Sequence, residues 1–414
     1  MQKMILQYFI LMLGSISVSC SKDNPELPLE KAVYRNFQSI AAFEKTWDSL
    51  SVIADSVVRK NQMGELWDSL KINNQLPFAI HDTVVFMYKG KSEPYWAGDF
   101  NGWGSETTGW KGKRIGNSDF WWLKKQFPPD ARLDYKVVVG NSWILDPSNP
   151  QIQYSGWGPN SQLTMPEWIF PAETELHQGV ISGSLSEIQQ IQSNSTNLGY
   201  KVNYRVYLPY NYASTDRMPV IYVTDGHEYA DAKLGAMTVI LDNLIYEGII
   251  GPVIAVFVDP RNPANGENRR MDEYRANIRF VNFLADELVN KIDENYKTLQ
   301  SSHERAILGT SLGGWNAAYT GFHRSEKFGL IGIHSPAFDD AILNSFENSE
   351  KLDLKLFMST GTIYDTQLKA TAMRDILQAK GYDLNYIEVN QGHSWGNWRG
   401  LTDAALICFF SRNP

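Results

Sequence analysis

The sequence has few cysteines, and their positions exclude disulfide chemistry. It contains only Cys20 and Cys408 in 414 residues. We expect Cys20 to end an export signal, so the mature chain would keep a single thiol. One thiol excludes an intrachain disulfide and a cysteine metal cluster. Cys408 follows Ala405-Leu406-Ile407, so we expect a small buried hydrophobic residue in a fold stabilised by core burial.

Positive charge is not in excess either. Lys and Arg total 38 against 46 Asp and Glu, which gives a net charge of -8, and no basic cluster is present. Nucleic-acid binding normally requires a clustered basic face, so this partner is excluded. Hydrophobic residues make up 43% and charged residues 20%, which is typical of globular proteins. The 13 tryptophans are many, and such residues stack on sugars or, more often, pack in cores.

Residues 1–20 have the pattern of an export signal. Lys3 supplies positive charge, residues 4–16 are apolar, and small residues lead to Cys20. The apolar run is too short to span a membrane comfortably. A cysteine at this point resembles a bacterial lipobox, although Ser17 stands where leucine is usual. We therefore expect an exported lipoprotein anchored through Cys20 in the bacterial outer membrane, on its periplasmic or surface face. Plain export with a chance cysteine is the alternative.

Two regions with different residue patterns follow the predicted signal. Residues 21–75 read as a polar tether and a helical segment, with Phe43, Trp47, Leu50 and Ile53 at helical spacing. Residues 76–172 contain short apolar and aromatic runs separated by turn residues, which predict a small β-sandwich. The expected strands are residues 83–88, 94–97, 121–127 and 133–139.

Residues 173–414 alternate between strand and helix patterns, which predicts a mostly parallel sheet with helices on both faces. The clearest helix is 278–292, and a closing helix is expected at 402–410. The expected strands are 202–208, 219–224, 253–258, 306–308, 329–333, 355–359 and 385–389.

One short stretch points to chemistry. Gly309-Thr310-Ser311-Leu312-Gly313 lies between an expected strand and an expected helix. Glycine permits the sharp turn that such a junction needs. The G-x-S-x-G pattern with a serine at its apex is typical of the nucleophile elbow of serine hydrolases. Because five-residue patterns also arise by chance, the rest of the chain has to decide.

A serine nucleophile needs a base and a carboxylate that orients the base. In hydrolases with this elbow they follow in the order serine, acid, histidine. His393 lies in a loop after the last expected strand, and Asp365 follows the end of the preceding one. Asp339 and Asp340 are alternatives at the end of the strand before that. We favour Asp365 because its position is nearer the histidine loop.

Two backbone donors are expected to stabilise a developing oxyanion. One is the N–H of Leu312, which follows the serine, and the other is the N–H of His227, in a loop where Gly226 permits a tight turn. Three aromatic residues are candidates for the walls of an acyl pocket, or for packing beside it: Tyr229, Trp315 and Trp395.

These motifs together resemble the putative esterase family. The resemblance is carried by residues 309–314, Asp225-Gly226, residues 283–288 and Gly392-His393-Ser394-Trp395, and spans about Gly179 to the C-terminus. The family includes esterase D, mycolyltransferases, enterochelin esterases and the feruloyl esterases of carbohydrate esterase family one. The resemblance implies an α/β-hydrolase fold for residues 173–414 and ester hydrolysis through an acyl-enzyme, without a cofactor or metal.

The region before it resembles the module that precedes enterochelin esterase domains and many feruloyl esterase domains. The matching stretches are W-A-G-D-F-N-G-W at residues 96–103 and L-D-P-S-N-P at residues 145–150. The resemblance implies an early-set immunoglobulin-like fold of the glycogen-binding type for residues 76–172. Trp103 or Trp110 would contact sugar if the module binds glycan, but core packing is the default expectation.

The leading hypothesis is an exported serine esterase that removes feruloyl or acetyl groups from xylan-derived oligosaccharides, because such an enzyme meets ester-bearing carbohydrate outside the cytoplasm. Two alternatives stay open. One is an enterochelin-type siderophore esterase, and the other is a non-catalytic glycan-binding lipoprotein that retains a hydrolase fold.

Overall fold

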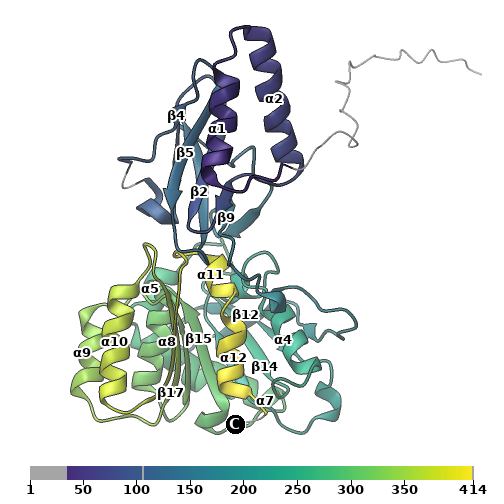
Figure 1. The fold of residues 1–414 in the computed structure, drawn as a ribbon. Coiled ribbons are helices and arrows are strands. Elements are labelled where there is room, and N and C mark those ends of the chain that lie inside the picture. The colour runs from purple at the N-terminus through teal and green to yellow at the C-terminus, as the bar shows by residue number, and fades with distance from the viewer. Residues whose placement is uncertain (1–34, 105–106, 413–414) are drawn as a thin grey trace, which may run out of the picture.

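The computed structural model describes residues 35–104 and 107–412. Figure 1 shows a smaller N-terminal part standing on a larger C-terminal α/β part. The predicted export signal, the lipidation site Cys20 and most of the tether lie outside the described residues. Among the helices of the described ranges, none combines the length and the apolar character needed to cross a membrane.

The C-terminal part is built on a nine-stranded sheet with the order β10-β12-β14-β13-β15-β16-β17-β18, in which β11 also pairs with β12. Strands β13 to β18 run parallel, and β12 is antiparallel to β14. The seven strands predicted for this region are confirmed with small shifts at their ends. The bounds are β10 Ser184–Leu185, β11 Gln189–Gln192, β12 Lys201–Leu208, β13 Val220–Val223, β14 Ile254–Asp259, β15 Arg305–Thr310, β16 Leu330–His334, β17 Lys355–Gly361 and β18 Asp383–Val389.

Helices cover both faces of this sheet, as predicted for residues 173–414. Successive side chains of a strand point to opposite faces, and β13 shows the effect. Val220 and Tyr222 join a core with α8, α9 and α10, whereas Ile221 and Val223 join a core with α4, α11 and α12. This is an α/β-hydrolase-like arrangement. The bounds of these six helices are α4 Met237–Tyr246, α8 Leu312–His323, α9 Asp340–Asn348, α10 Gln367–Ala379, α11 Trp395–Arg399 and α12 Thr402–Phe410.

Two sequence-based details differ. The predicted helix 278–292 is α6 Ile278–Asn282, a π-helical turn at Phe283–Leu288 and α7 Val289–Asn295. The π turn keeps four side chains of the segment buried in the core, and hydrophobic periodicity alone does not reveal it. Cys408 was predicted to be a small buried hydrophobic residue, but it is only half-buried on α12.

The N-terminal part contains two antiparallel sheets. One has the order β1-β2-β5-β4, and the other has the order β3-β6-β9-β8 with β7 paired to β6. Val84 and Phe86 of β2 pack against Leu133 and Tyr135 of β6, so a shared core lies between the sheets. The bounds are β1 Phe78–Ile80, β2 Thr83–Lys89, β3 Pro94–Gly98, β4 Lys113–Arg114, β5 Phe120–Gln126, β6 Arg132–Val139, β7 Ser142–Ile144, β8 Ile152–Ser155 and β9 Gly158–Thr164.

Two helices cover the other face of the first sheet. Phe43 and Trp47 of α1 (Ile40–Ser51) pack with Val85 and Met87 of β2, and α2 (Ser56–Ile72) joins the same cluster. The helical segment therefore packs on the sandwich. Ile53 lies in the connection after α1, so its predicted place on the helix was wrong.

The two tryptophans considered for sugar binding differ in exposure. The Trp110 side chain is buried and its ring stacks on Phe100, with centroids 4.3 Å apart. Trp103 is half-buried and its indole N–H donates to Asp99 Oδ1 at 3.0 Å. Core packing thus accounts for Trp110.

Candidate active site

The Gly309–Gly313 stretch forms a tight turn between β15 and α8. Ser311 at its apex has φ 58° and ψ -118°, a strained conformation for a residue with a Cβ atom. A Cβ on Gly309 would lie 2.2 Å from the carbonyl oxygen of Gly313, and one on Gly313 would lie 2.6 Å from Thr224 Oγ1. Gly309 is therefore required by the close approach of the Gly313 backbone, and Gly313 by the close approach of the Thr224 side chain. The turn directs the serine out of the sheet edge.

Three side chains that are distant in the sequence meet at this edge. His393 Nε2 lies 2.9 Å from Ser311 Oγ, and His393 Nδ1 lies 2.6 Å from Asp365 Oδ1. Ser311 follows β15, Asp365 follows β17, and His393 follows β18. They converge because the carboxyl ends of parallel strands lie at one edge of a sheet.

Asp365 has a buried carboxylate that is fully engaged. Its second oxygen accepts hydrogen bonds from Ser335 Oγ at 2.6 Å, from the N–H of Gly361 at 2.6 Å and from Asn397 Nδ2 at 3.4 Å. Burial by itself would raise the pKa of this carboxyl, but the hydrogen bonds, that of His393 first, hold the pKa below its ordinary value. An anionic Asp365 accepts from Nδ1–H of His393, which leaves Nε2 free to accept the serine proton.

The two rival carboxylates are engaged elsewhere. Asp339 caps α9, accepting from the N–H of Ile342 at 3.2 Å, and also accepts from Trp315 Nε1 at 3.2 Å. Asp340 forms an ion pair with Lys369. The structure therefore brings Asp365, rather than these residues, to the histidine.

The two predicted oxyanion donors lie at neighbouring helix starts. Leu312 is the first residue of α8, and His227 is the second residue of α3 (Gly226–Tyr229). Backbone N–H groups in a first helical turn have no carbonyl partner within the helix. The preceding strands β15 and β13 are adjacent in the sheet. Burial lowers the pKa of the His227 imidazole to about 4, so this side chain is neutral near pH 7.

An arginine that the sequence reasoning missed joins the two loops. Arg270 Nε lies 2.9 Å from both carboxylate oxygens of Asp225, and its Nη2 donates to the carbonyl of Thr310 at 3.1 Å. Asp225 precedes the α3 turn and Thr310 precedes the serine. Arg270 thus connects the loop with His227 to the elbow. Nothing in its local sequence marks this role, because all its partners are distant.

The three predicted wall residues are buried. Tyr229 is 0% exposed, Trp315 2% and Trp395 3%. The rings of Tyr229 and Trp395 meet edge to face with centroids 4.9 Å apart, and Trp395 Nε1 donates to Glu228 Oε2 at 2.9 Å. In this conformation they support the site through packing and leave little surface for an acyl group.

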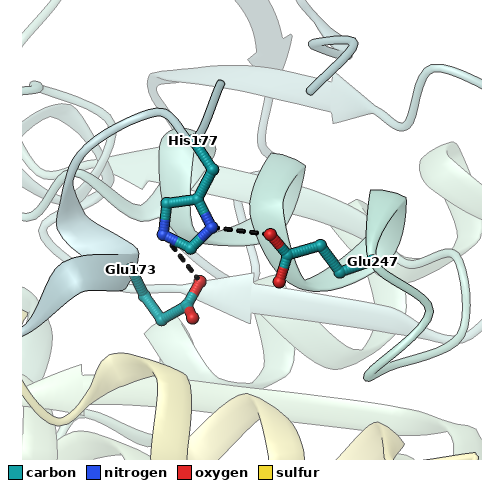
Figure 2. Close-up of side chains that lie close together, drawn as sticks. All are labelled: Glu173, His177 and Glu247. Atoms are coloured by element: carbon teal, nitrogen blue, oxygen red, sulfur yellow. Dashed lines mark hydrogen bonds and ion pairs between the residues drawn. The ribbon is translucent and has the colours of Figure 1, made fainter. Parts of the chain in front are cut away.

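The described residues contain one group of side chains that is suited to a metal ion, and it lies outside this constellation. Figure 2 shows Glu173 and His177, from the segment after the sandwich, facing Glu247 at the end of α4. His177 Nδ1 lies 2.6 Å from Glu247 Oε1, and its Nε2 lies 4.0 Å from Glu173 Oε2. This geometry fits a protonated imidazole between two carboxylates.

This ion pair is expected to make stability depend on pH. The hydrogen bond to Glu247 raises the pKa of His177. A raised folded pKa gives stability that is complete below the unfolded value of about 6.5 and is lost as pH rises through the folded pKa. The difference in thermal midpoint between wild type and His177→Gln should therefore be largest in mild acid and should shrink in alkaline solution. Glu247→Gln should behave alike, and a constant difference would contradict the assignment.

Comparisons with known proteins agree with this architecture. The model of the family described as "Putative esterase" matches residues 195–409. An uncharacterized protein of Bacillus subtilis (strain 168), YjcH, is 26% identical over 231 residues, which is 53% of this chain and 95% of that protein.

A second relative is the endo-1,4-beta-xylanase/feruloyl esterase of Xylanibacter ruminicola. It is 32% identical over 156 residues, which is 36% of this chain and 21% of that protein. Among solved structures, the ferric enterobactin esterase of Salmonella typhimurium superposes with a TM-score of 0.68 at 16% identity, covering 79% of this chain and 93% of that one. This likeness shows a shared fold, and it extends over more of the chain than residues 195–409.

Proposed function

Because the chain belongs to the putative esterase family, we propose that it is a serine carboxylic ester hydrolase. The observation that carries this proposal is the chain of hydrogen bonds from Ser311 through His393 to Asp365. Serine, base and orienting carboxylate in this geometry are the requirements for nucleophilic acyl transfer.

The proposed reaction has two halves. Ser311 Oγ attacks the ester carbonyl carbon while His393 Nε2 takes its proton, and the N–H groups of Leu312 and His227 stabilise the oxyanion. The ester C–O bond then breaks, and the alcohol leaves with the proton from His393. A water molecule attacks the acyl-enzyme with the help of the same base, which releases the acid and restores Ser311. Asp365 keeps His393 in the required tautomer and orientation throughout.

We propose feruloyl or acetyl esters of xylan-derived oligosaccharides as the substrates. Support comes from the relative named a xylanase/feruloyl esterase and from the export signal that the sequence predicts for residues 1–20. In this proposal the chain is a lipoprotein attached through Cys20 to the outer membrane, where it meets carbohydrate esters outside the cytoplasm. The fold shared with a ferric enterobactin esterase makes a siderophore ester the substrate to test against.

A competition assay tests the substrate. The mature chain without residues 1–20 is given methyl ferulate, feruloylated arabinoxylan fragments, acetylated xylo-oligosaccharides, and ferric and metal-free enterobactin. We expect the highest kcat/KM on a feruloylated or acetylated carbohydrate. Faster turnover of enterobactin would instead indicate a siderophore esterase. Retention on a glycan column, without turnover of any ester and without labelling by a fluorophosphonate, would instead indicate a non-catalytic glycan-binding protein.

A further inference from the structure

The N-terminal part of the molecule contacts the segment that carries His393. Figure 1 shows α11 (Trp395–Arg399) directly below the sandwich, at the junction of the two parts. At one end of this segment Asn390 Nδ2 donates to Asp130 Oδ1 at 2.8 Å, and at the other Arg399 Nη2 donates to Gln153 Oε1 at 2.8 Å. The loop that holds the proposed base is therefore tied to the sandwich on both sides.

Arg132, the first residue of β6, makes the central contact. Its backbone N–H donates to the carbonyl of Asn390 at 3.2 Å, and its Nη1 donates to Ser394 Oγ at 3.0 Å. A Cβ placed on Gly396 would lie 2.0 Å from the Arg132 Cζ atom. The guanidinium thus lies directly against the backbone of α11, immediately after His393, and only glycine leaves room for it.

The guanidinium is itself rigidly held. Arg132 is 1% exposed. Its Nε and Nη2 donate to Gln162 Oε1 at 3.1 and 3.0 Å, and Nη2 lies 2.5 Å from Asp134 Oδ1. The planar guanidinium of arginine donates to several partners simultaneously in a fixed geometry, whereas the compact ammonium of lysine cannot replace all of these contacts. A side chain held this rigidly by the sandwich restricts the movement of the segment it contacts, which is Ser394 and α11.

A second side chain of the same network, that of Asp99, lies against Gly392, the residue before the histidine. Asp99 Oδ2 accepts from the N–H of Asp134 at 2.8 Å. A Cβ on Gly392 would lie 2.3 Å from Asp99 Cβ. Asp99 and Arg132 therefore lie against the residues before and after His393. The buried charge of Arg132 is costly to retain for stability alone, which favours a role in fixing geometry.

We propose that Arg132 is a positioning residue for the proposed reaction, which holds the His393 loop so that Nε2 stays within hydrogen-bond distance of Ser311. The sandwich is then a required part of the ester-hydrolysing machinery and more than a carbohydrate-binding attachment. This inference rests on the proposed serine mechanism, and it concerns the position of the base independently of the acyl or sugar group.

Positioning of the base and glycan binding predict different kinetic changes. A displaced base slows turnover of every ester, because His393 takes the proton of Ser311, and later that of the attacking water, whichever ester is bound. Loss of a sugar contact would raise KM for oligosaccharide esters and spare small ones. A displacement of 1 Å in a catalytic group costs up to about 100-fold in rate.

The test uses the mature full chain with Arg132→Lys, and Gly396→Ala as a second variant that displaces the guanidinium from the opposite side. Arg114→Lys, an exposed arginine of β4 in the same sandwich, is the matched control. We expect kcat to fall about 10- to 100-fold on both 4-nitrophenyl acetate and feruloylated arabinoxylan fragments, with KM within about twofold. The control should match wild type.

Labelling by a fluorophosphonate distinguishes positioning from partial unfolding. If Arg132 positions the base, every molecule of the variant should become labelled at Ser311, but more slowly than in wild type. If the variant is partly unfolded, only a fraction of the molecules should become labelled, at the wild-type rate. The second result would overturn the inference. Wild-type kcat in Arg132→Lys and Gly396→Ala, or a loss confined to oligosaccharide esters, would overturn it too. If wild type neither labels nor turns over any ester, the serine mechanism itself fails, and that outcome is visible without the variants.

Discussion

Replacing Ser311 with alanine is expected to lower kcat for ester hydrolysis by about 10⁵-fold or more, because the acyl-enzyme cannot form. The side chain removed is the only part of the turn that changes, since the close contacts of Gly309 and Gly313 remain. The protein should stay folded, and relief of the strained φ of 58° is not expected because alanine keeps the Cβ atom.

Two measurements check this result. Initial rates on methyl ferulate and on a short acetyl ester should fall together, and fluorophosphonate labelling followed by peptide mapping should lose the adduct on the peptide containing Ser311. Ser345→Ala on α9, where the hydroxyl donates to the carbonyl of Ala341, is the matched control and should label normally. Undiminished turnover in Ser311→Ala would refute the proposed nucleophile.

Replacing Asp365 with asparagine is expected to lower kcat by about 10⁴-fold through the wrong histidine tautomer. The partners of the carboxylate explain why. Ser335 Oγ and the N–H of Gly361 both donate to one oxygen, so the amide oxygen must face them. The amide NH₂ then faces His393 Nδ1, which becomes an acceptor. The ring proton moves to Nε2, and that nitrogen can no longer take the proton of Ser311.

Asp339→Asn is the matched control, because this residue was the sequence-level rival. It caps α9 and accepts from Trp315 Nε1. Asparagine keeps a side-chain oxygen that can cap the helix equally well, so this replacement should leave both stability and kcat near the wild-type values. Equal losses of kcat in the two variants, at equal folded fractions, would contradict the assignment of Asp365.

Much of the fold followed from local patterns. The alternation of Val220, Ile221, Tyr222 and Val223 between two cores is what a strand buried on both faces requires, and an unbroken apolar run reveals it. The turn at Gly309–Gly313 could be predicted from the sequence, because the close contacts of each glycine involve residues nearby in the chain or the end of the adjacent strand. Local spacing did not reveal the π turn at 283–288, whose four apolar side chains stay buried.

Sequence order alone indicated a serine, an acid and a histidine, because parallel strands place their carboxyl ends at one edge. It determined the fold class and the residues able to react. Only the tertiary structure decided which aspartate meets His393, that Tyr229, Trp315 and Trp395 are buried, and that Arg132 lies against Gly396. Those outcomes depend on contacts between residues up to 264 positions apart, such as Arg132 and Gly396. Such contacts arise where distant segments pack together in the tertiary structure, and no pattern within one segment records them.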